Sequence, residues 1–323
     1  MPLTYSLDKP VLLHYNNYNF DFLNCERALV CSYLVAHGFP FQWFLSDSWG
    51  FFYRSHTDFS INKAGEAPAW MNSLQRVYGI EITMLREEDL RATAETAINE
   101  DEALFIFVDG WHVPWYYAFQ SKHEMHALAV VDVDKENDCL RMTDFWPTVF
   151  TDWMDAGVID TAYQAGDKLM VRLTRPDFHY SDELFRTQMI NCHALMVGGE
   201  SDGEWAGLSG LQKFRGDLVA MGDTAKEHIA DWWEFLKPIN DVRSGFYEFL
   251  YYLEQHEPKL YQQQIDPELL TAVNETVIAW YALRNGMLKA KMTDTYSQKR
   301  ILAALDKVIL LEEKCAELLA KTL

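Results

Sequence analysis

Residues 126–145, HALAVVDVDKENDCLRMTDF, predict a β-hairpin. Two runs rich in apolar and β-branched residues, 127–133 and 140–145, flank a polar turn near 135–138. His126 begins the first strand and Asp144 ends the second. Because an antiparallel hairpin brings the start of one strand beside the end of the other, His126 and Asp144 should be neighbours.

A helix is predicted upstream of this hairpin, at residues 25–36 (CERALVCSYLVA). Its apolar positions recur at helical spacing, and Gly38 follows where a C′ glycine is expected. Cys25 therefore stands in the first turn, where the positive end of the helix macrodipole favours a thiolate. The free backbone N–H groups of that turn could face an oxyanion. We expect Cys25 to be the most reactive thiol of the chain.

Cys25, His126 and Asp144 together supply a nucleophile, a base and an acid that orients the base, which is the set of groups that acyl transfer through a cysteine requires. In this triad Cys25 attacks the acyl carbonyl, His126 takes and returns the proton, and Asp144 determines the tautomer of His126. His123 is the alternative base.

Residues around the triad add weaker candidates. Asn19, six residues before Cys25, is the candidate for a second oxyanion donor, although Asn16 and Asn17 are equally polar. Three aromatic residues after the helix are interpreted either as a substrate pocket or as core residues: Trp49, Phe51 and Phe52. The remaining cysteines are interpreted as packing residues: Cys31, Cys139, Cys192 and Cys315.

The pattern of apolar residues changes near Pro176. Before it, further strand-like runs occur at 10–15, 104–113 and 168–173, whereas after it one amphipathic helix follows another. The sequence therefore predicts an α+β fold with two domains. Residues 1–176 form a catalytic domain with a small antiparallel sheet, and residues 177–323 form an all-α helical domain.

The order of a cysteine at a helix start, a histidine on a strand and an aspartate on the next strand resembles the papain-like arrangement. More closely, the first half resembles the N-terminal domain of the butirosin biosynthesis protein H family. The resemblance rests on Asn24-Cys25-Glu26 with its helix, LFIFVDGWHVPWYY at 104–117, the His126 strand, and the DFWP turn at 144–147. The helical remainder, with WAGLSGLQKFRGDL, RSGFYEFLYYL and a helix containing Trp280, is similar to the C-terminal region of that family. The chain departs from the family pattern at Asn24, where members often carry histidine, and in the aromatic stretch 46–53, where they are rich in glycine.

This resemblance implies a cysteine acyltransferase of natural-product biosynthesis that needs no cofactor. Its donor would be an acyl or peptidyl carrier protein with a phosphopantetheine thioester, and its acceptor an amine that becomes an amide. Two other functions stay open at this point. One is a cysteine peptidase or amidase with the same triad, and the other is a non-catalytic module that binds a carrier protein or a peptide.

Composition and charge exclude several classes of protein. With 28 Lys and Arg against 48 Asp and Glu, the net charge of -20 argues against a nucleic-acid partner. No apolar run approaches the ~20 residues that cross a bilayer, and the opening MPLTYSLDKP does not look like an export signal. Five cysteines without C-x-x-C spacing fit a reducing cytoplasm, and no metal motif is complete.

The acidity also bears on the expected partner. Carrier proteins are usually acidic, and like charges slow association, so docking would need a local basic patch. Two groups of cations are candidates: Lys213 with Arg215, and Lys289, Lys291, Lys299 with Arg300.

Overall fold

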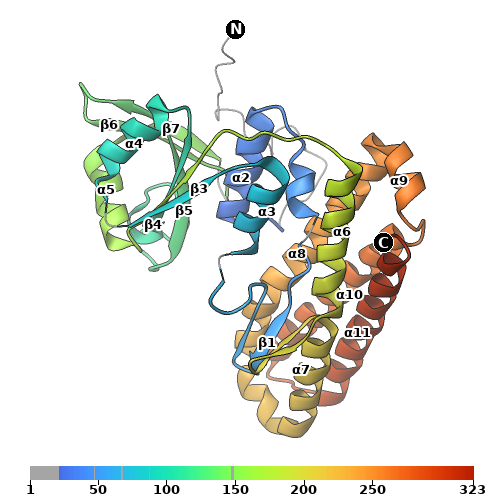
Figure 1. Cartoon of the computed structure of the whole chain (residues 1–323). Helices are drawn as coiled ribbons and strands as arrows, with labels where there is room; N and C mark the ends of the chain where they lie inside the picture. The colour runs from blue at the N-terminus through green and yellow to red at the C-terminus, as the bar shows by residue number, and fades with distance from the viewer. Residues whose placement is uncertain (1–21, 47, 67, 87, 147–148) are drawn as a thin grey trace. The chain divides into compact units, whose positions relative to one another are not determined.

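The computed structural model describes residues 22–46, 48–66, 68–86, 88–146 and 149–323. The chain folds into two compact units (Figure 1). The first contains the described residues before Gln42 together with Leu74–His179, and the second contains Gln42–Ser73 and Tyr180–Leu323. The boundaries fall within the 3₁₀ helix η1 (Phe41–Leu45), within helix α3 (Ala69–Tyr78), and after His179.

The first unit is built on an antiparallel sheet whose six described strands follow the order β3-β8-β4-β5-β6-β7. They are β3 (Ile82–Arg86), β4 (Ala103–Asp109), β5 (Met125–Asp134), β6 (Cys139–Asp144), β7 (Phe150–Asp155) and β8 (Leu169–Leu173). Helices α4 (Leu90–Asn99) and α5 (Ala156–Ala165) lie on one side of the sheet, and α2 (Cys25–Ala36) lies on the other (Figure 1). Because both faces are covered, all seven residues of β4 are buried, which explains its unbroken apolar sequence.

The mixed α+β class is confirmed, as are the helix at 25–36 and strands near 104, 127, 140 and 168. The strand predicted at 10–15 lies outside the described residues. The run at 104–113 ends as a strand at Asp109, whose side chain accepts a hydrogen bond from Trp111 N–H and starts the 3₁₀ helix η2 (Gly110–His112). The edge strands β3 and β7 were not predicted, because most of their residues are exposed or half-buried and show no alternation.

The second unit combines long helices with a small antiparallel sheet in the order β2-β1-β10-β9. The strands are β1 (Phe52–Ser55), β2 (Asp58–Ser60), β9 (Gly199–Ser201) and β10 (Glu204–Ala206). The helices are α6 (Asp182–Val197), α7 (Gly207–Met221), η3 (Gly222–His228), α8 (Ile229–His256), α9 (Pro258–Gln264), α10 (Leu269–Thr293) and α11 (Gln298–Ala320). No helix in the described parts of the chain combines the length and the apolar character needed to cross a membrane.

The division of the chain differs from the predicted one in two places. The expectation of an all-α region after residue 176 is wrong at 199–206, where β9 and β10 form a hairpin. Its two turn residues, Asp202 and Gly203, both have positive φ, as a type I′ turn requires. Segment 42–73, which the sequence assigns to the first domain, groups with the second unit because β1 pairs with β10.

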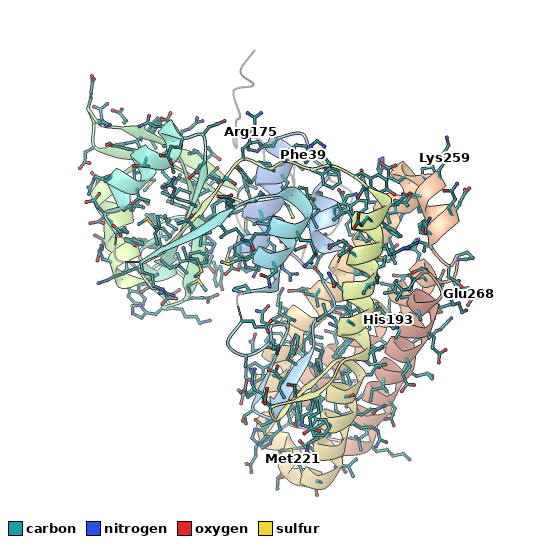
Figure 2. The ribbon with its side chains drawn as sticks, in the orientation of Figure 1. Phe39, Arg175, His193, Met221, Lys259 and Glu268 are labelled. Carbon is teal, nitrogen blue, oxygen red and sulfur yellow. The ribbon has the colours of Figure 1, made fainter. Side chains whose placement is uncertain are left out.

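A buried ion pair joins α8 to α11 inside the second unit. Charged side chains such as Lys259 and Glu268 lie on the surface (Figure 2), whereas Arg243 and Glu312 are almost completely buried. Arg243 donates to both carboxylate oxygens of Glu312, at 2.9 and 3.3 Å, and to the carbonyl oxygen of Gly50 at 2.8 Å. The indole N–H groups of Trp49 and Trp280 donate to the same carboxylate, at 2.5 and 2.6 Å. The pair is therefore fully hydrogen-bonded, as a buried charge must be.

Replacing Glu312 by Ala should lower the free energy of unfolding by about 3–5 kcal/mol, because Arg243 is left buried without its counter-charge. Denaturant titration followed by far-UV circular dichroism measures the loss. Arg215→Met, which breaks the exposed pair between α7 and Asp306 of α11, should leave the transition almost unchanged. Equal effects of the two substitutions would contradict the prediction.

Glu248 on α8 makes the second unit sensitive to pH. Burial raises the pKa of Glu248 to about 7, and a hydrogen bond from Gln42 offsets this only in part. The folded state then binds a proton to Glu248 more tightly than the unfolded state does, so the contribution of this carboxyl group to stability is greatest below about pH 4.5 and is lost as the pH rises through about 7. Glu248→Gln should remove this loss, which is about 3 kcal/mol at most. The same substitution at the exposed Glu234 of α8 should leave the pH dependence of unfolding as it is.

Candidate active site

Helix α2 places Cys25 by local signals at both of its ends. Asn24 is the N-cap, and its side-chain oxygen accepts the N–H of Arg27 at 3.0 Å, which makes Cys25 the first helical residue. At the other end Gly38 adopts a φ of 82°, and the N–H of Phe39 bonds the carbonyl of Leu34 at 3.0 Å. This is a Schellman ending, and glycine suits it because it has no Cβ. The helix therefore starts and stops where its sequence indicates.

The pairing of β5 with β6 brings His126 and Asp144 together, as predicted. Ala129 lies opposite Thr143, so Asp144 is a diagonal neighbour of His126 on the same face of the sheet. His126 Nε2 lies 2.7 Å from Asp144 Oδ2, and both side chains are buried. Since a carboxylate only accepts, His126 must carry its hydrogen on Nε2.

Two tryptophans complete the environment of Asp144. The indole N–H of Trp115 donates to Oδ2 at 2.9 Å, and the backbone N–H of Trp146 donates to Oδ1 at 3.0 Å. With His126, three described residues thus hold this buried carboxylate in one orientation. Trp115 also stacks on Phe150 at 3.7 Å between ring centroids.

The other ring nitrogen of His126 is exceptional. Nδ1 is buried and has no hydrogen-bond partner within the described residues. The ring of Tyr116 stacks on the imidazole at 3.9 Å and so holds its plane. Tyr116 fits there because residue 110 is glycine, since a Cβ at Gly110 would lie 2.6 Å from the tyrosine ring. A buried acceptor without a donor calls for an explanation, and an acceptor reserved for a thiol proton provides one.

Cys25 lies beside this dyad in the first unit. Helix α2 packs against β5, and the backbone N–H of Ala127, the residue after His126, is hydrogen-bonded to the Cys25 sulfur. Burial raises the pKa of the thiol to about 12, the N–H groups of Ala127 and Glu26 oppose this in part, and the charge of Asp144 adds to the increase. Cys25 is therefore a neutral thiol in this structure. The expectation that the helix start favours a thiolate is outweighed by burial.

A second histidine and carboxylate pair lies nearby on the chain. His123 Nδ1 lies 2.6 Å from Asp109 Oδ2, and its ring stacks on Trp111 at 4.6 Å between centroids. This is the alternative base of the sequence analysis. It differs from His126 because its side chain is 71% exposed, whereas that of His126 is completely buried.

The remaining sequence candidates do not join the triad. Asn19, like Asn16 and Asn17, lies outside the described residues. Trp49, Phe51 and Phe52 are buried in the second unit, where Trp49 bonds Glu312 and Phe51 belongs to the hydrophobic core. Their interpretation as core aromatics is therefore the one that the structure favours over a substrate pocket. Three of the remaining cysteines are buried, whereas Cys139 is partly exposed.

Three functional neighbours were missed from sequence: Trp115, Tyr116 and Trp146. For Trp115 and Tyr116 the signal lay in the run GWHVPWYY at 110–117, which has an unusual density of aromatic residues with hydrogen-bonding tips for a segment outside any strand. Which of these aromatic rings contacts His126 depends on the path of the loop between β4 and β5, which the sequence pattern does not give.

Neither a metal site nor a relative adds to the assignment. Among the described residues, no group of three or more His, Cys, Asp or Glu side chains could hold a metal ion. No protein-family model matches the chain, and no similar sequence was found among curated proteins. The assignment therefore rests on the geometry around Cys25.

The pKa of Cys25 predicts the order in which the thiols react. In the native protein near pH 7, iodoacetamide should alkylate the partly exposed Cys139 before Cys25. The alkylation rate at Cys25 should rise about tenfold per pH unit from pH 7 to about pH 9 without levelling off, because only the thiolate reacts. Peptide mapping by mass spectrometry measures both. A rate at Cys25 that is already constant near pH 7 would instead indicate a thiolate paired with a protonated His126.

Proposed function

We propose that this chain is a papain-like cysteine acyltransferase that takes an acyl group from a carrier-protein thioester onto Cys25 and passes it to an amine. Two observations carry the proposal: His126 Nδ1 is buried without a hydrogen-bond partner among the described residues while Nε2 bonds Asp144, and the Cys25 sulfur bonds the backbone N–H of Ala127, the next residue. The order of Cys25, His126 and Asp144 along the chain, which resembles that of the butirosin biosynthesis protein H family, supports the same function. The free cysteines fit a cytoplasmic location.

Loading begins with a proton transfer. His126 Nδ1 takes the proton of the Cys25 thiol as the sulfur attacks the thioester carbonyl, and Asp144 stabilises the imidazolium that forms. The tetrahedral intermediate collapses when the carbon–sulfur bond to the carrier breaks. The carrier thiolate receives the proton back from Nδ1, which leaves an acyl group on Cys25 and a neutral His126.

Transfer follows the same steps, but the amine is now the nucleophile and the Cys25 sulfur is the leaving group. The amine attacks the acyl-Cys25 carbonyl and gives a proton to His126 Nδ1. The carbon–sulfur bond to Cys25 breaks, the amide leaves, and Nδ1 returns the proton to the Cys25 sulfur. Loading therefore ends with acyl-Cys25 and a neutral imidazole, and transfer ends with the thiol and the imidazole both neutral, as the raised pKa of Cys25 favours.

The neutral thiol favours a thioester donor over a peptide. A thioester expels a thiolate, which leaves readily, whereas an amide must expel an amine that is protonated first. A site with a weakly acidic thiol and one base is thus better matched to thioester exchange. The N–H groups of Glu26 and Ala127, which already point to the sulfur, are the nearest described donors for an oxyanion.

Acyl loading tests this proposal directly. The full chain is incubated with a carrier protein that bears an acyl-phosphopantetheine thioester, and its intact mass is measured before and after an amine is added. We expect an acyl adduct on Cys25 that disappears as the amide forms. Cys25→Ala should abolish the adduct, whereas Cys31→Ala, a buried position on the same helix, should keep it at a cost of about 1 kcal/mol in stability.

Matched substitutions in the two histidine pairs test the role of Asp144. Asp144→Asn should slow loading by about 10³- to 10⁴-fold, because an amide no longer selects the tautomer with Nδ1 free. Asp109→Asn, in the pair with the exposed His123, should leave the rate nearly unchanged. A comparable loss of loading rate in Asp109→Asn would indicate that His123, rather than His126, is the base.

The other functions give different results in the loading experiment. Release of the acyl group as a free acid, with or without amine, would indicate an amidase or peptidase. A wild-type chain that never forms an adduct with any thioester would contradict catalysis altogether and leave a binding module.

A further inference from the structure

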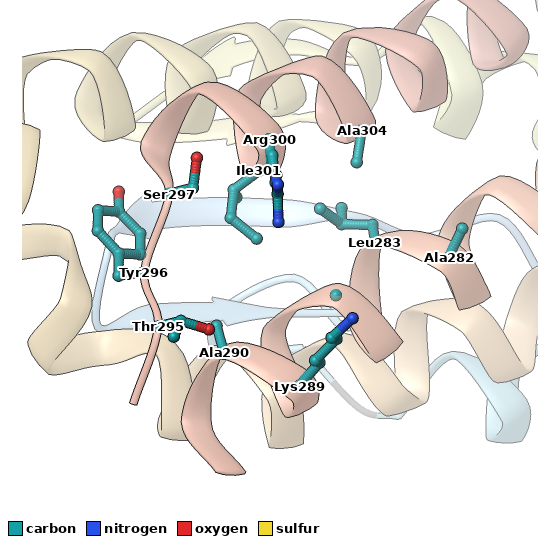
Figure 3. A pocket seen from close by; sticks show the side chains of 11 residues that line it. Ala282, Leu283, Lys289, Ala290, Thr295, Tyr296, Ser297, Arg300, Ile301 and Ala304 are labelled. Atoms are coloured by element: carbon teal, nitrogen blue, oxygen red, sulfur yellow. The ribbon is translucent and has the colours of Figure 1, made fainter. Parts of the chain in front are cut away.

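A cavity of about 540 Å³ lies between helices α10 and α11 in the second unit (Figure 3). It opens where the chain turns from one helix into the other, and residues 282–304 supply its walls. None of the described residues that line it is acidic. In a chain with 48 Asp and Glu residues, this absence of carboxylates gives the cavity a local charge opposite to that of the whole protein.

Two cations from different helices point into this cavity. Figure 3 shows Lys289 of α10 and Arg300 of α11 extending toward the space between the helices. Neither side chain forms an ion pair or a hydrogen bond with any described residue, whereas nearby Lys213 and Arg215 are paired with Asp217 and Asp306. Two like charges that face one cavity without a carboxylate repel each other, and a bound anion would remove that repulsion.

A further donor lies at the same end of the cavity. Ser297 lines it as the N-cap of α11, but its hydroxyl makes no capping bond to that helix. Ser297 Oγ is therefore free to donate to a ligand.

The floor of the cavity is apolar. Leu283 and Ile301 are buried beneath it, and Ala290 and Ala304 line its sides. The cavity thus combines a cationic rim with a hydrocarbon surface large enough for part of an organic molecule.

We propose that this cavity binds a small organic phosphate monoester. The phosphate carries a charge of about −1.5 to −2 near pH 7, which matches two cations better than a carboxylate or a phosphodiester with a single charge. Its oxygens bridge Lys289 and Arg300 and accept from the Ser297 hydroxyl, and the organic part lies on Leu283 and Ile301. The site is independent of the reaction proposed at Cys25.

Isothermal titration of the full chain with phenyl phosphate tests the site. We expect saturable binding that weakens at higher ionic strength. Inorganic phosphate, which lacks the apolar part, should bind more weakly, and phenol, which lacks the charge, should not bind. Lys289→Ala and Arg300→Ala should each weaken binding by about tenfold, since each removes a charge-assisted hydrogen bond.

The matched control is Lys307→Ala, an exposed cation further along α11 that does not line the cavity. It should leave the affinity unchanged, and circular dichroism should show all three variants folded because the residues replaced are exposed. The proposal fails if phenyl phosphate does not saturate in the millimolar range, if phenol binds as well, or if Lys307→Ala weakens binding as much as Lys289→Ala. If a variant does not fold, the wild type alone still tests the proposal: an affinity for phenyl phosphate that does not change with ionic strength would overturn it. None of these outcomes bears on acyl loading.

Discussion

The buried carboxylate of Asp144 is the group on which the organisation of the candidate site depends. A charge in the interior is costly unless hydrogen bonds replace its hydration, and here three donors do so: His126, Trp115 and the backbone of residue 146. These donors come from β5, from the loop after β4 and from the turn after β6. Satisfying one carboxylate therefore holds together three separate segments, and it sets the tautomer of His126.

Glu312 of the second unit is buried as deeply as Asp144, and the difference between these two acids separates a structural role from a chemical one. Glu312 is balanced by a permanent cation, Arg243. Its carboxylate accepts hydrogen bonds from Arg243 and from the indole N–H groups of Trp49 and Trp280. Asp144 has no cation beside it among the described residues. Its nearest group is an imidazole, which becomes positive only when it takes a proton, so Asp144 can stabilise a charge that appears during a reaction. Within the described parts of the chain one nitrogen of this imidazole has no hydrogen-bond partner, which is what a reaction needs and what a purely structural network would avoid.

Burial also decides the chemistry of Cys25. The start of a helix favours a thiolate, but the sulfur lies against β5 and beside a negative charge, and these raise its pKa. The raised pKa favours the neutral thiol of Cys25 over its thiolate. That arrangement protects the cysteine from adventitious electrophiles and suits a substrate that is already activated, such as a thioester.

Local patterns were sufficient for several parts of this protein. The span of α2 follows from Asn24, its apolar positions and Gly38, and the neighbourhood of His126 and Asp144 follows from the length of one hairpin, because caps and hairpins are made by residues close in sequence. Edge strands, the position of segment 42–73 and the role of Trp49 could not be found in this way. They depend on pairings between distant residues, such as Phe52 with Ala206 and Trp49 with Glu312.

The same distinction holds at the site itself. The sequence alone determined which residues could act as nucleophile, base and orienting acid, since those identities and their order are local facts. Only the tertiary structure decided that Tyr116 stacks on His126, that Nδ1 is left without a partner and that Cys25 is a neutral thiol. These properties arise from burial and from charges contributed by segments far apart in the chain, and no pattern within a single segment encodes them.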